Sequence, residues 1–200
     1  MLAWGAIGIG YLLGSISFSF LLGKWWKDID IRDYGSGNAG ATNTLRVLGV
    51  GPAIFVLALD IAKGVAAVWI GLKMGQDRDL IAVLAGLAAI VGHNWPIFLK
   101  FRGGKGIATT IGVVATLCFG PALFAGVVAI LSIVITRYVS LGSLLFTGLL
   151  PIFSYFMKFP PEIVWATVVI AVFAYVRHRT NIVKLLRGTE HKIGKKASGQ

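Results

Sequence analysis

The sequence predicts an all-α polytopic membrane protein with seven transmembrane helices, folded as a single domain over residues 1–200. Hydrophobic residues make up 56% of the chain and charged residues only 14%, whereas a soluble domain is about 45–50% apolar with about a quarter of its residues charged. The apolar residues form long uncharged runs, and most of the charges behind the formal net charge of +11 lie between these runs. We therefore expect lipid to be the solvent for much of the surface.

The first apolar run, Met1–Gly23, carries no charged side chain, and the first charge along the chain is Lys24. A cleaved signal peptide places its positive charge before the apolar stretch rather than after it. We therefore expect a spanning helix whose N-terminus lies outside and whose Lys24 lies inside.

Four further runs approach the length of about 20 apolar residues that a spanning helix needs. They are Gly51–Leu72, Leu80–Leu99, Tyr138–Met157 and the shorter Ile163–Val176. The first of them carries Asp60 and Lys63, which are three residues apart and so share one helical face. Charges at membrane depth usually pair or line a pathway. We interpret the two as a structural pair, with a proton relay as the alternative.

The uncharged run Gly106–Thr136 is too long for one ordinary span. At about 1.5 Å per residue a single helix would reach about 46 Å, beyond the bilayer core of about 30 Å. Gly120–Pro121 interrupts the run near its middle. The sequence therefore allows either one long helix or a hairpin of two short helices around Gly120–Pro121.

The distribution of positive charge favours the hairpin. With seven spans, all but four of the 19 lysines and arginines lie on the cytoplasmic side; the exceptions are Lys63, Lys73, Arg78 and Lys158. A single long helix would place more of them outside than inside. The positive-inside rule therefore selects seven spans with the N-terminus outside and the C-terminus cytoplasmic.

This topology places three polar segments on one face: Tyr34–Gly49, Gly92–Gly106 and Arg177–Gly188. In the first, Gly35, Gly37 and Gly40 fit a G-x-G-x-x-G spacing, but the strand and βαβ unit of a dinucleotide fold are not predicted. Glycines still let backbone N–H groups approach an anion, and Arg46 adds a fork suited to phosphate. The alternative is a flexible turn between helices.

The other two segments add a lysine and a histidine. Lys105 lies in Gly103–Gly106, where a short helix should begin, although such a loop could serve only to set topology. His178 and Asn181 are three apart and would share a helical face, and His178 can act as acid, base or donor; the alternative is a histidine at a helix end. We expect a structural or supporting role for His93 and solvation for His191.

The composition of these segments narrows the chemistry. They hold many bases and few acids, and no His, Cys, Asp and Glu cluster has metal-ligand spacing. Neither paired carboxylates nor a nucleic-acid-binding module is present. The sole cysteine, Cys118, lies in an apolar run and can form no internal disulfide. The segments therefore predict a site for a phosphate ester without a protein-bound metal, and no nucleic-acid partner.

At these segments the chain resembles the bacterial acyl-phosphate:glycerol-3-phosphate acyltransferases (the PlsY family). The stretches that carry the resemblance are Tyr11–Ser17, Gly35–Asn43 with Arg46, Gly92–Pro96, Phe101–Gly106 and His178–Ile182. Their order and spacing agree over essentially the whole chain. The other acyltransferase class has a His followed by Asp five positions later, and none of the three histidines here is so followed.

The resemblance implies a seven-spanning enzyme of the bacterial cytoplasmic (inner) membrane, with its active site facing the cytoplasm. It would transfer a fatty acyl group from acyl phosphate to the 1-hydroxyl of glycerol 3-phosphate, giving 1-acylglycerol 3-phosphate and inorganic phosphate. This reaction is the first acylation of phospholipid synthesis. We expect no cofactor, and membrane lipid as a further partner.

On this basis we assign roles to the candidate residues. The catalytic group is His178, Lys105, Ser36, Arg46 and Asn181. The phosphate-binding group is Gly35, Gly37, Asn38, Gly40, Thr42, Asn43, Gly103 and Gly104. Either His178 or an oxygen of the acyl phosphate would take the proton. A phosphate or other anion transporter is the main alternative, although transporters bind near the bilayer midplane; a lipid-binding scaffold would need no such polar cluster. We expect the small, polar Ala197–Gln200 to be a remnant of expression.

Overall fold

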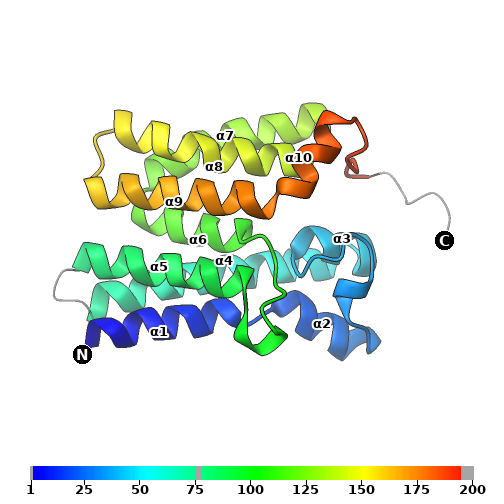
Figure 1. Cartoon of the computed structure of the whole chain (residues 1–200), viewed down its shortest axis with the longest axis horizontal. Coiled ribbons are helices and arrows are strands. Elements are labelled where there is room, and N and C mark those ends of the chain that lie inside the picture. Colours follow the sequence, from blue (N-terminus) through cyan, green and yellow to red (C-terminus); the bar gives the residue numbers. More distant parts are fainter. Residues whose placement is uncertain (1, 75–77, 195–200) are drawn as a thin grey trace. The chain divides into compact units, whose positions relative to one another are not determined.

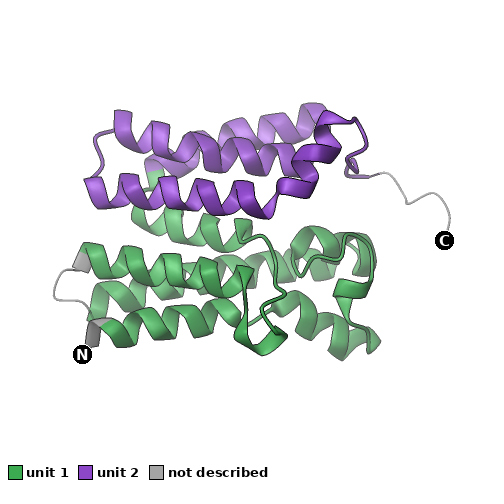
Figure 2. Ribbon diagram, viewed as in Figure 1, with its two compact units in different colours: residues 1–119 green, residues 120–200 purple. Residues whose placement is uncertain are grey.

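The computed structural model describes residues 2–74 and 78–194, and these residues form helices and connecting turns without a β-strand. The all-α prediction is therefore confirmed for the part of the chain that the structure describes. Contacts divide the chain into two compact units, unit 1 (Met1–Phe119) and unit 2 (Gly120–Gln200) (Figure 2). Ala197–Gln200 lie outside the described residues, as do two of the predicted cytoplasmic lysines, Lys195 and Lys196.

Unit 1 begins with a span made of two helices rather than one. α1 (Leu2–Ser15) and α2 (Phe18–Lys27) are separated by Ile16 and Ser17, and Ser17 is extended at φ −96° and ψ 96°. Trp4–Lys27 has the length and apolar character of a membrane span. The predicted span Met1–Gly23 is thus present, but it is broken at Ile16–Ser17 and continues to Lys27.

The remaining elements of unit 1 are two 3-10 turns, a short polar helix and three apolar helices (Figure 1). A 3-10 turn η1 (Ile31–Asp33) and α3 (Ala41–Leu48) precede α4 (Val50–Met74) and α5 (Arg78–Asn94). A second 3-10 turn η2 (Ile97–Leu99) then leads to α6 (Ile107–Leu117).

Small residues bring the helices of unit 1 close together. A Cβ on Gly14 would overlap the backbone of Ala89, and one on Gly64 would overlap the carbonyl oxygen of Thr109. Such close backbone approach is the packing that small residues allow in membranes. α1 and α5, and α4 and α6, are therefore held in tight pairs.

The described residues of unit 2 form three apolar helices and one short polar helix. They are α7 (Phe119–Thr136, of which Phe119 belongs to unit 1), α8 (Val139–Phe156), α9 (Pro161–Arg177) and α10 (Arg179–Leu186). α9 and α10 meet at a bend of 64°. The chain then returns to the start of α8, where the N–H of Ile193 donates to the carbonyl of Arg137 at 2.9 Å.

Each predicted span has a helical counterpart in the described residues, but not every one of these helices is long enough by itself to cross a bilayer. Within residues 2–74 and 78–194, five helical segments are long and apolar enough to cross a bilayer, with α1 and α2 counted as one, and six if α9 and α10 also count as one span. α6 has 11 residues, about 17 Å of helix against a core of about 30 Å. Seven spans and their orientation therefore stay a prediction.

The break in the long run Gly106–Thr136 falls at Cys118, two residues before the predicted position. Gly120 and Pro121 instead lie in the first turn of α7. Proline is tolerated there because the first N–H groups of a helix have no intrahelical acceptor. Two helices in this run are thus observed, whereas their hairpin relation stays a prediction.

Candidate phosphate site at two glycine loops

The first glycine loop, residues 34–40, is held from beneath by the side chain of Asn43, which is fully buried. Its Oδ1 accepts from the backbone N–H of Ser36 at 2.7 Å and from the Ser36 hydroxyl at 3.1 Å. Its Nδ2 donates to the carbonyls of Ile31 at 2.9 Å and Tyr34 at 3.0 Å. Both ends of the amide are therefore committed to the shape of the loop.

Glycine is required where this loop passes over Asn43. Gly35 has φ +61°, a backbone conformation that side chains disfavour, and a Cβ there would overlap Asn43 Oδ1. Gly37 has φ +70°. The loop is thus a fixed turn rather than the flexible connection that the sequence left open.

The first glycine loop and the start of α3 carry groups that suit an anion. The Ser36 side chain is exposed, and α3 begins at Ala41 after Gly40 as N-cap. Thr42 and Arg46 are four residues apart on α3 and so lie on one face. No acidic residue occupies the first turn of α3, so the positive end of its dipole is not offset there.

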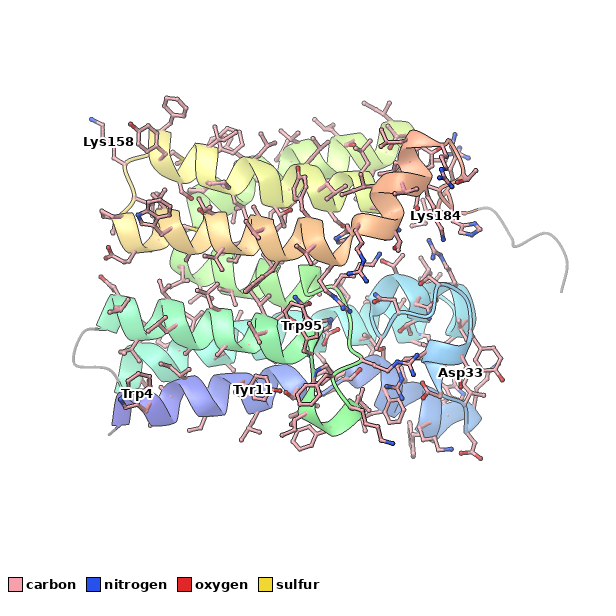
Figure 3. The ribbon with its side chains drawn as sticks, viewed as in Figure 1. Trp4, Tyr11, Asp33, Trp95, Lys158 and Lys184 are labelled. Atoms are coloured by element: carbon pink, nitrogen blue, oxygen red, sulfur yellow. The ribbon has the colours of Figure 1, made fainter. Side chains whose placement is uncertain are left out.

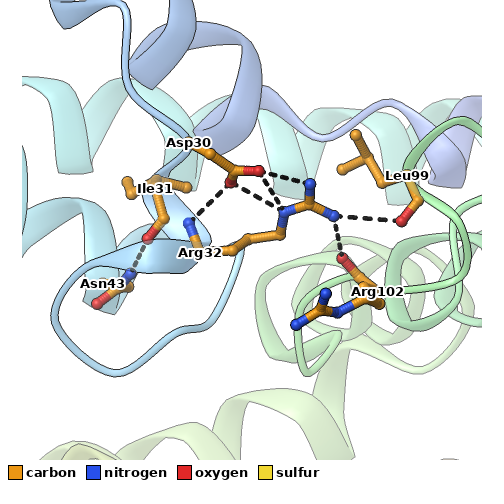
Figure 4. A network of polar contacts seen from close by, with 6 residues as sticks. All are labelled: Asp30, Ile31, Arg32, Asn43, Leu99 and Arg102. Atoms are coloured by element: carbon orange, nitrogen blue, oxygen red, sulfur yellow. Dashed lines mark hydrogen bonds and ion pairs between the residues drawn. The ribbon is translucent and has the colours of Figure 1, made fainter.

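Arg32, just before the first loop, is hydrogen-bonded to the segment just before the second loop (Figure 4). Its Nη2 lies 2.6 Å from Asp30 Oδ2 and its Nε 2.9 Å from Asp30 Oδ1. Its Nη1 donates to the carbonyls of Leu99 at 3.2 Å and Arg102 at 3.3 Å. The hydrogen bond from Arg32 holds the pKa of the Asp30 carboxyl below its ordinary value. Sequence reasoning did not single out this pair; its signal was an aspartate that precedes an arginine by two residues just before the glycine loop.

The second glycine loop, residues 103–106, packs against the first. The N–H of Gly104 donates to the carbonyl of His93 at 3.0 Å. A Cβ on Gly104 would overlap the His93 ring and would lie 2.6 Å from the carbonyl oxygen of Ala39. The structure therefore brings two of the three predicted segments together, with backbone against backbone.

Lys105 stands between a buried pair of glycines and the start of a helix. Gly106 has φ +78° and is the N-cap of α6. Lys105 itself is partly exposed. Its position agrees with the expectation that the lysine precedes a short helix.

The third segment lies in unit 2, where His178 is the N-cap of α10 and is buried. Its Nδ1 lies 2.8 Å from the carbonyl oxygen of Ala174. Because a carbonyl only accepts, Nδ1 carries the hydrogen, which leaves Nε2 as the ring nitrogen that can take a proton. That the third segment meets the first two stays a prediction.

Asn181 is oriented by a buried carboxylate that sequence reasoning had counted only as a nearby acid. Its Nδ2 donates to Glu190 Oε1 at 2.8 Å, and Ser140 donates to the same oxygen at 3.1 Å. Glu190 follows α10 in the chain but contacts the start of α8 through Ser140. No local pattern signals this return of the chain.

Asp60 and Lys63 form a buried pair on α4. Their Oδ1 and Nζ atoms lie 2.8 Å apart. Lys63 also donates to the carbonyls of Gly14 at 3.0 Å and Ile16 at 2.7 Å. His93 Nδ1 lies 3.5 Å from Asp60 Oδ1. Figure 3 draws the described side chains of the whole chain, with Asp33 labelled just before the first loop and Trp95 labelled between α5 and the second loop.

No group of three or more His, Cys, Asp or Glu in residues 2–74 and 78–194 is placed to hold a metal ion. The charged groups at the glycine loops are instead mostly cations, together with backbone N–H groups. This donor set suits an anion rather than a metal.

Comparison with known proteins gives one consistent family. A family model described as glycerol-3-phosphate acyltransferase matches residues 4–188. A glycerol-3-phosphate acyltransferase of Shouchella clausii (strain KSM-K16) is 61% identical over 192 residues, covering 94% of each chain. One of Halalkalibacterium halodurans is 55% identical over 200 residues, covering 98% of this chain and 97% of the relative.

Two solved structures have the same fold. A crystal structure of PlsY (YgiH), an integral membrane glycerol 3-phosphate acyltransferase, in its glycerol 3-phosphate form matches with a TM-score of 0.91 and 38% identity, covering 96% of both chains. The lysophosphatidic acid form matches with a TM-score of 0.88 and 37% identity, covering 96% of this chain and 95% of that one.

Proposed function

The chain belongs to the glycerol-3-phosphate acyltransferase family, and from this premise we propose that it transfers a fatty acyl group from acyl phosphate to the 1-hydroxyl of glycerol 3-phosphate. The products are 1-acylglycerol 3-phosphate and inorganic phosphate. The observation that carries this proposal is the packing of two glycine loops, one with Ser36 and one with Lys105, against each other in unit 1. Both proposed substrates bear phosphate, which accounts for two such loops.

The proposed chemistry suits a site that is rich in cations and poor in carboxylates. An acyl phosphate is a mixed anhydride, so the substrate hydroxyl can attack its carbonyl carbon directly without a covalent enzyme intermediate. A C–O ester bond forms, the bond from the acyl carbon to the phosphate oxygen breaks, and phosphate leaves. The protein then has to position two anions and stabilise the charge that develops on the carbonyl and leaving oxygens.

We assign the first loop to phosphate binding. Ser36, Thr42 and Arg46 contact the anion together with the N–H groups of Gly35 and Asn38. Gly37 and Gly40, whose N–H groups donate to the carbonyls of Tyr34 and Asn38, shape the loop that holds the phosphate. Asn43 acts through Ser36, because its amide is engaged with the loop. Lys105, presented by Gly103 and Gly104, neutralises the leaving phosphate or the oxyanion.

His178 and Asn181 orient glycerol 3-phosphate in this proposal. The Nδ1–H of His178 is directed at Ala174, and in this proposal Nε2 accepts the hydroxyl proton. An oxygen of the acyl phosphate is the other acceptor for that proton. Asn181 Nδ2 donates to Glu190, and in this proposal the Asn181 carbonyl oxygen accepts from a hydroxyl of the substrate.

The proposed topology is the one predicted from the charges. Residues 1–200 form one domain with seven spans in the cytoplasmic membrane, the N-terminus outside and both the C-terminus and the site in the cytoplasm. The clustering of cations after α2, after α5 and after α9 supports this orientation. Protease removal of a C-terminal tag from inside-out vesicles, but not from intact cells, is the expected result.

One experiment separates this function from anion transport. Purified protein is mixed with labelled glycerol 3-phosphate and palmitoyl phosphate, and labelled lysophosphatidate is the expected product. Its absence under conditions where the protein is folded would overturn the proposal. Flux of phosphate or glycerol 3-phosphate into liposomes without acyl donor would favour a transporter. The structure gives no support to that role at Lys63, because its buried Nζ is engaged with Asp60 and two carbonyls.

A further inference from the structure

We propose that His93 is a positioning residue for the second glycine loop, residues 103–106, and through it for Lys105. Its imidazole is supported by a buried charge pair, Asp60 and Lys63, that is anchored on the break between α1 and α2. This inference rests on the proposed function and adds to it a residue that does not touch substrate.

The anchor of this network is the interrupted first span. At Ile16–Ser17 the helix is interrupted, so the carbonyls at this break lose their helical donors. Lys63 Nζ donates to two of them, Gly14 in the last turn of α1 and Ile16 directly after it. A buried ammonium is costly alone, and Asp60 at 2.8 Å offsets its charge.

The second step connects the charge pair to the end of α5. Asp60 Oδ1 lies 3.5 Å from His93 Nδ1. His93 is 6% exposed, Asp60 1% and Lys63 5%, so solvent screens this network little. The imidazole is therefore held between α4 and the loop that follows α5.

The third step connects His93 to Gly104. The backbone carbonyl of His93 accepts the Gly104 N–H, and the ring lies so close that Gly104 has no room for a Cβ. The same Cβ would also overlap the Ala39 carbonyl oxygen of the first loop. The His93 ring thus packs directly against Gly104 and limits where the second glycine loop can lie.

Lys105 follows Gly104 directly, so a shift of the loop moves the cation. A misplacement of about 1 Å at a reacting centre can reduce the rate about 100-fold. Lys105 is assigned to charge that develops during the reaction, so its displacement should lower kcat and leave ground-state binding largely intact.

The test compares His93→Ala, His93→Gln and Asp60→Asn with the unchanged protein, and His191→Ala is the matched control on an exposed histidine. The backbone hydrogen bond from Gly104 to the His93 carbonyl can form in every variant, so the two His93 variants change the side chain alone. kcat and KM for both substrates are measured in detergent, together with Tm. We expect His93→Ala to lower kcat about 10- to 100-fold with each KM within about threefold. His93→Gln, which fills the space and still reaches Asp60, should recover most of the rate.

The outcomes separate positioning from mere stability. An unchanged kcat in folded His93→Ala would overturn the proposal, as would a rise in KM with intact kcat. Equal losses of kcat in both His93 variants, with a matching fall in Tm, would overturn it as well. If His93→Ala does not fold, Asp60→Asn decides, and an unaltered kcat there would overturn the proposal. Loss of activity in His191→Ala would also refute the assignment. If the unchanged protein makes no lysophosphatidate, the proposed function fails instead.

Discussion

Replacement of Asn43 by alanine tests whether the first glycine loop is held as the structure indicates. The substitution removes one side chain that accepts twice from Ser36 and donates to the carbonyls of Ile31 and Tyr34. No charge is altered and no group assigned to direct phosphate contact is lost. The expected result is a loosened loop and a weaker enzyme.

The magnitude follows from where these four hydrogen bonds lie. The bond to Ile31 is buried, and an unsatisfied buried carbonyl costs about 1–3 kcal/mol. The other three involve Ser36 and Tyr34, which are exposed, so water replaces much of each. We therefore expect the free energy of loop opening to fall by about 2–3 kcal/mol, which corresponds to about 30- to 150-fold more opening.

Amide hydrogen exchange over residues 31–40 provides the assay. The N–H groups of Tyr34 and Gly37 donate within the loop, to Ile31 and Tyr34, and not to Asn43. Their faster exchange in Asn43→Ala would report the loop itself rather than the deleted bond. If both exchange as before in a folded variant that has lost activity, Asn43 contacts substrate and the reasoning given above is wrong.

Three further results are expected. Gly104→Ala should abolish most of the activity because a Cβ there would lie 2.6 Å from the Ala39 carbonyl oxygen. Gly126→Ala is the control and should leave activity intact, because a Cβ there meets nothing within 4 Å. Equal rates for the two variants would contradict this packing. The folded-state pKa of Asp30 lies below its unfolded value because its arginine partner stabilises the carboxylate. The contribution of this pair to the free energy of unfolding is therefore present above about pH 3.9 and is lost as pH falls through the lower, folded-state pKa. Asp30→Asn should therefore flatten the acid side of the Tm-versus-pH curve, and an identical slope in the variant would argue against the pair. His178→Gln should lower activity and change the acid limb of the pH–rate profile, and an unaltered rate and profile would exclude a role as general base.

The apolar runs predicted most helices because burial in lipid demands uninterrupted apolar length, and that length is visible in sequence. The break between α1 and α2 was not visible, because Ile16 and Ser17 carry no helix-breaking side chain. Its cause is a tertiary one, since Lys63 from another helix satisfies the freed carbonyls. Likewise, the break in the long run lies at Cys118, although Gly120–Pro121 was the stronger local signal.

The candidate site likewise has features that the sequence predicts and contacts that it does not. Glycines beside cations pointed to the two loops, and the structure brings those loops together through Gly104 and Ala39. The contacts that hold them are made by Asn43 and Arg32 to backbone carbonyls. Carbonyls are present at every residue, so no sequence pattern distinguishes the ones that become partners.

The interrupted first span has a consequence for how the protein enters the membrane. Before α4 arrives, α1 and α2 would expose unsatisfied carbonyls to hydrocarbon, where each costs several kcal/mol. α4 alone would in turn carry Lys63 and Asp60 into lipid, and isolated charges there are also expensive. Each segment supplies what the other lacks, so we expect the nascent chain to release them from the translocon as a pair rather than one at a time.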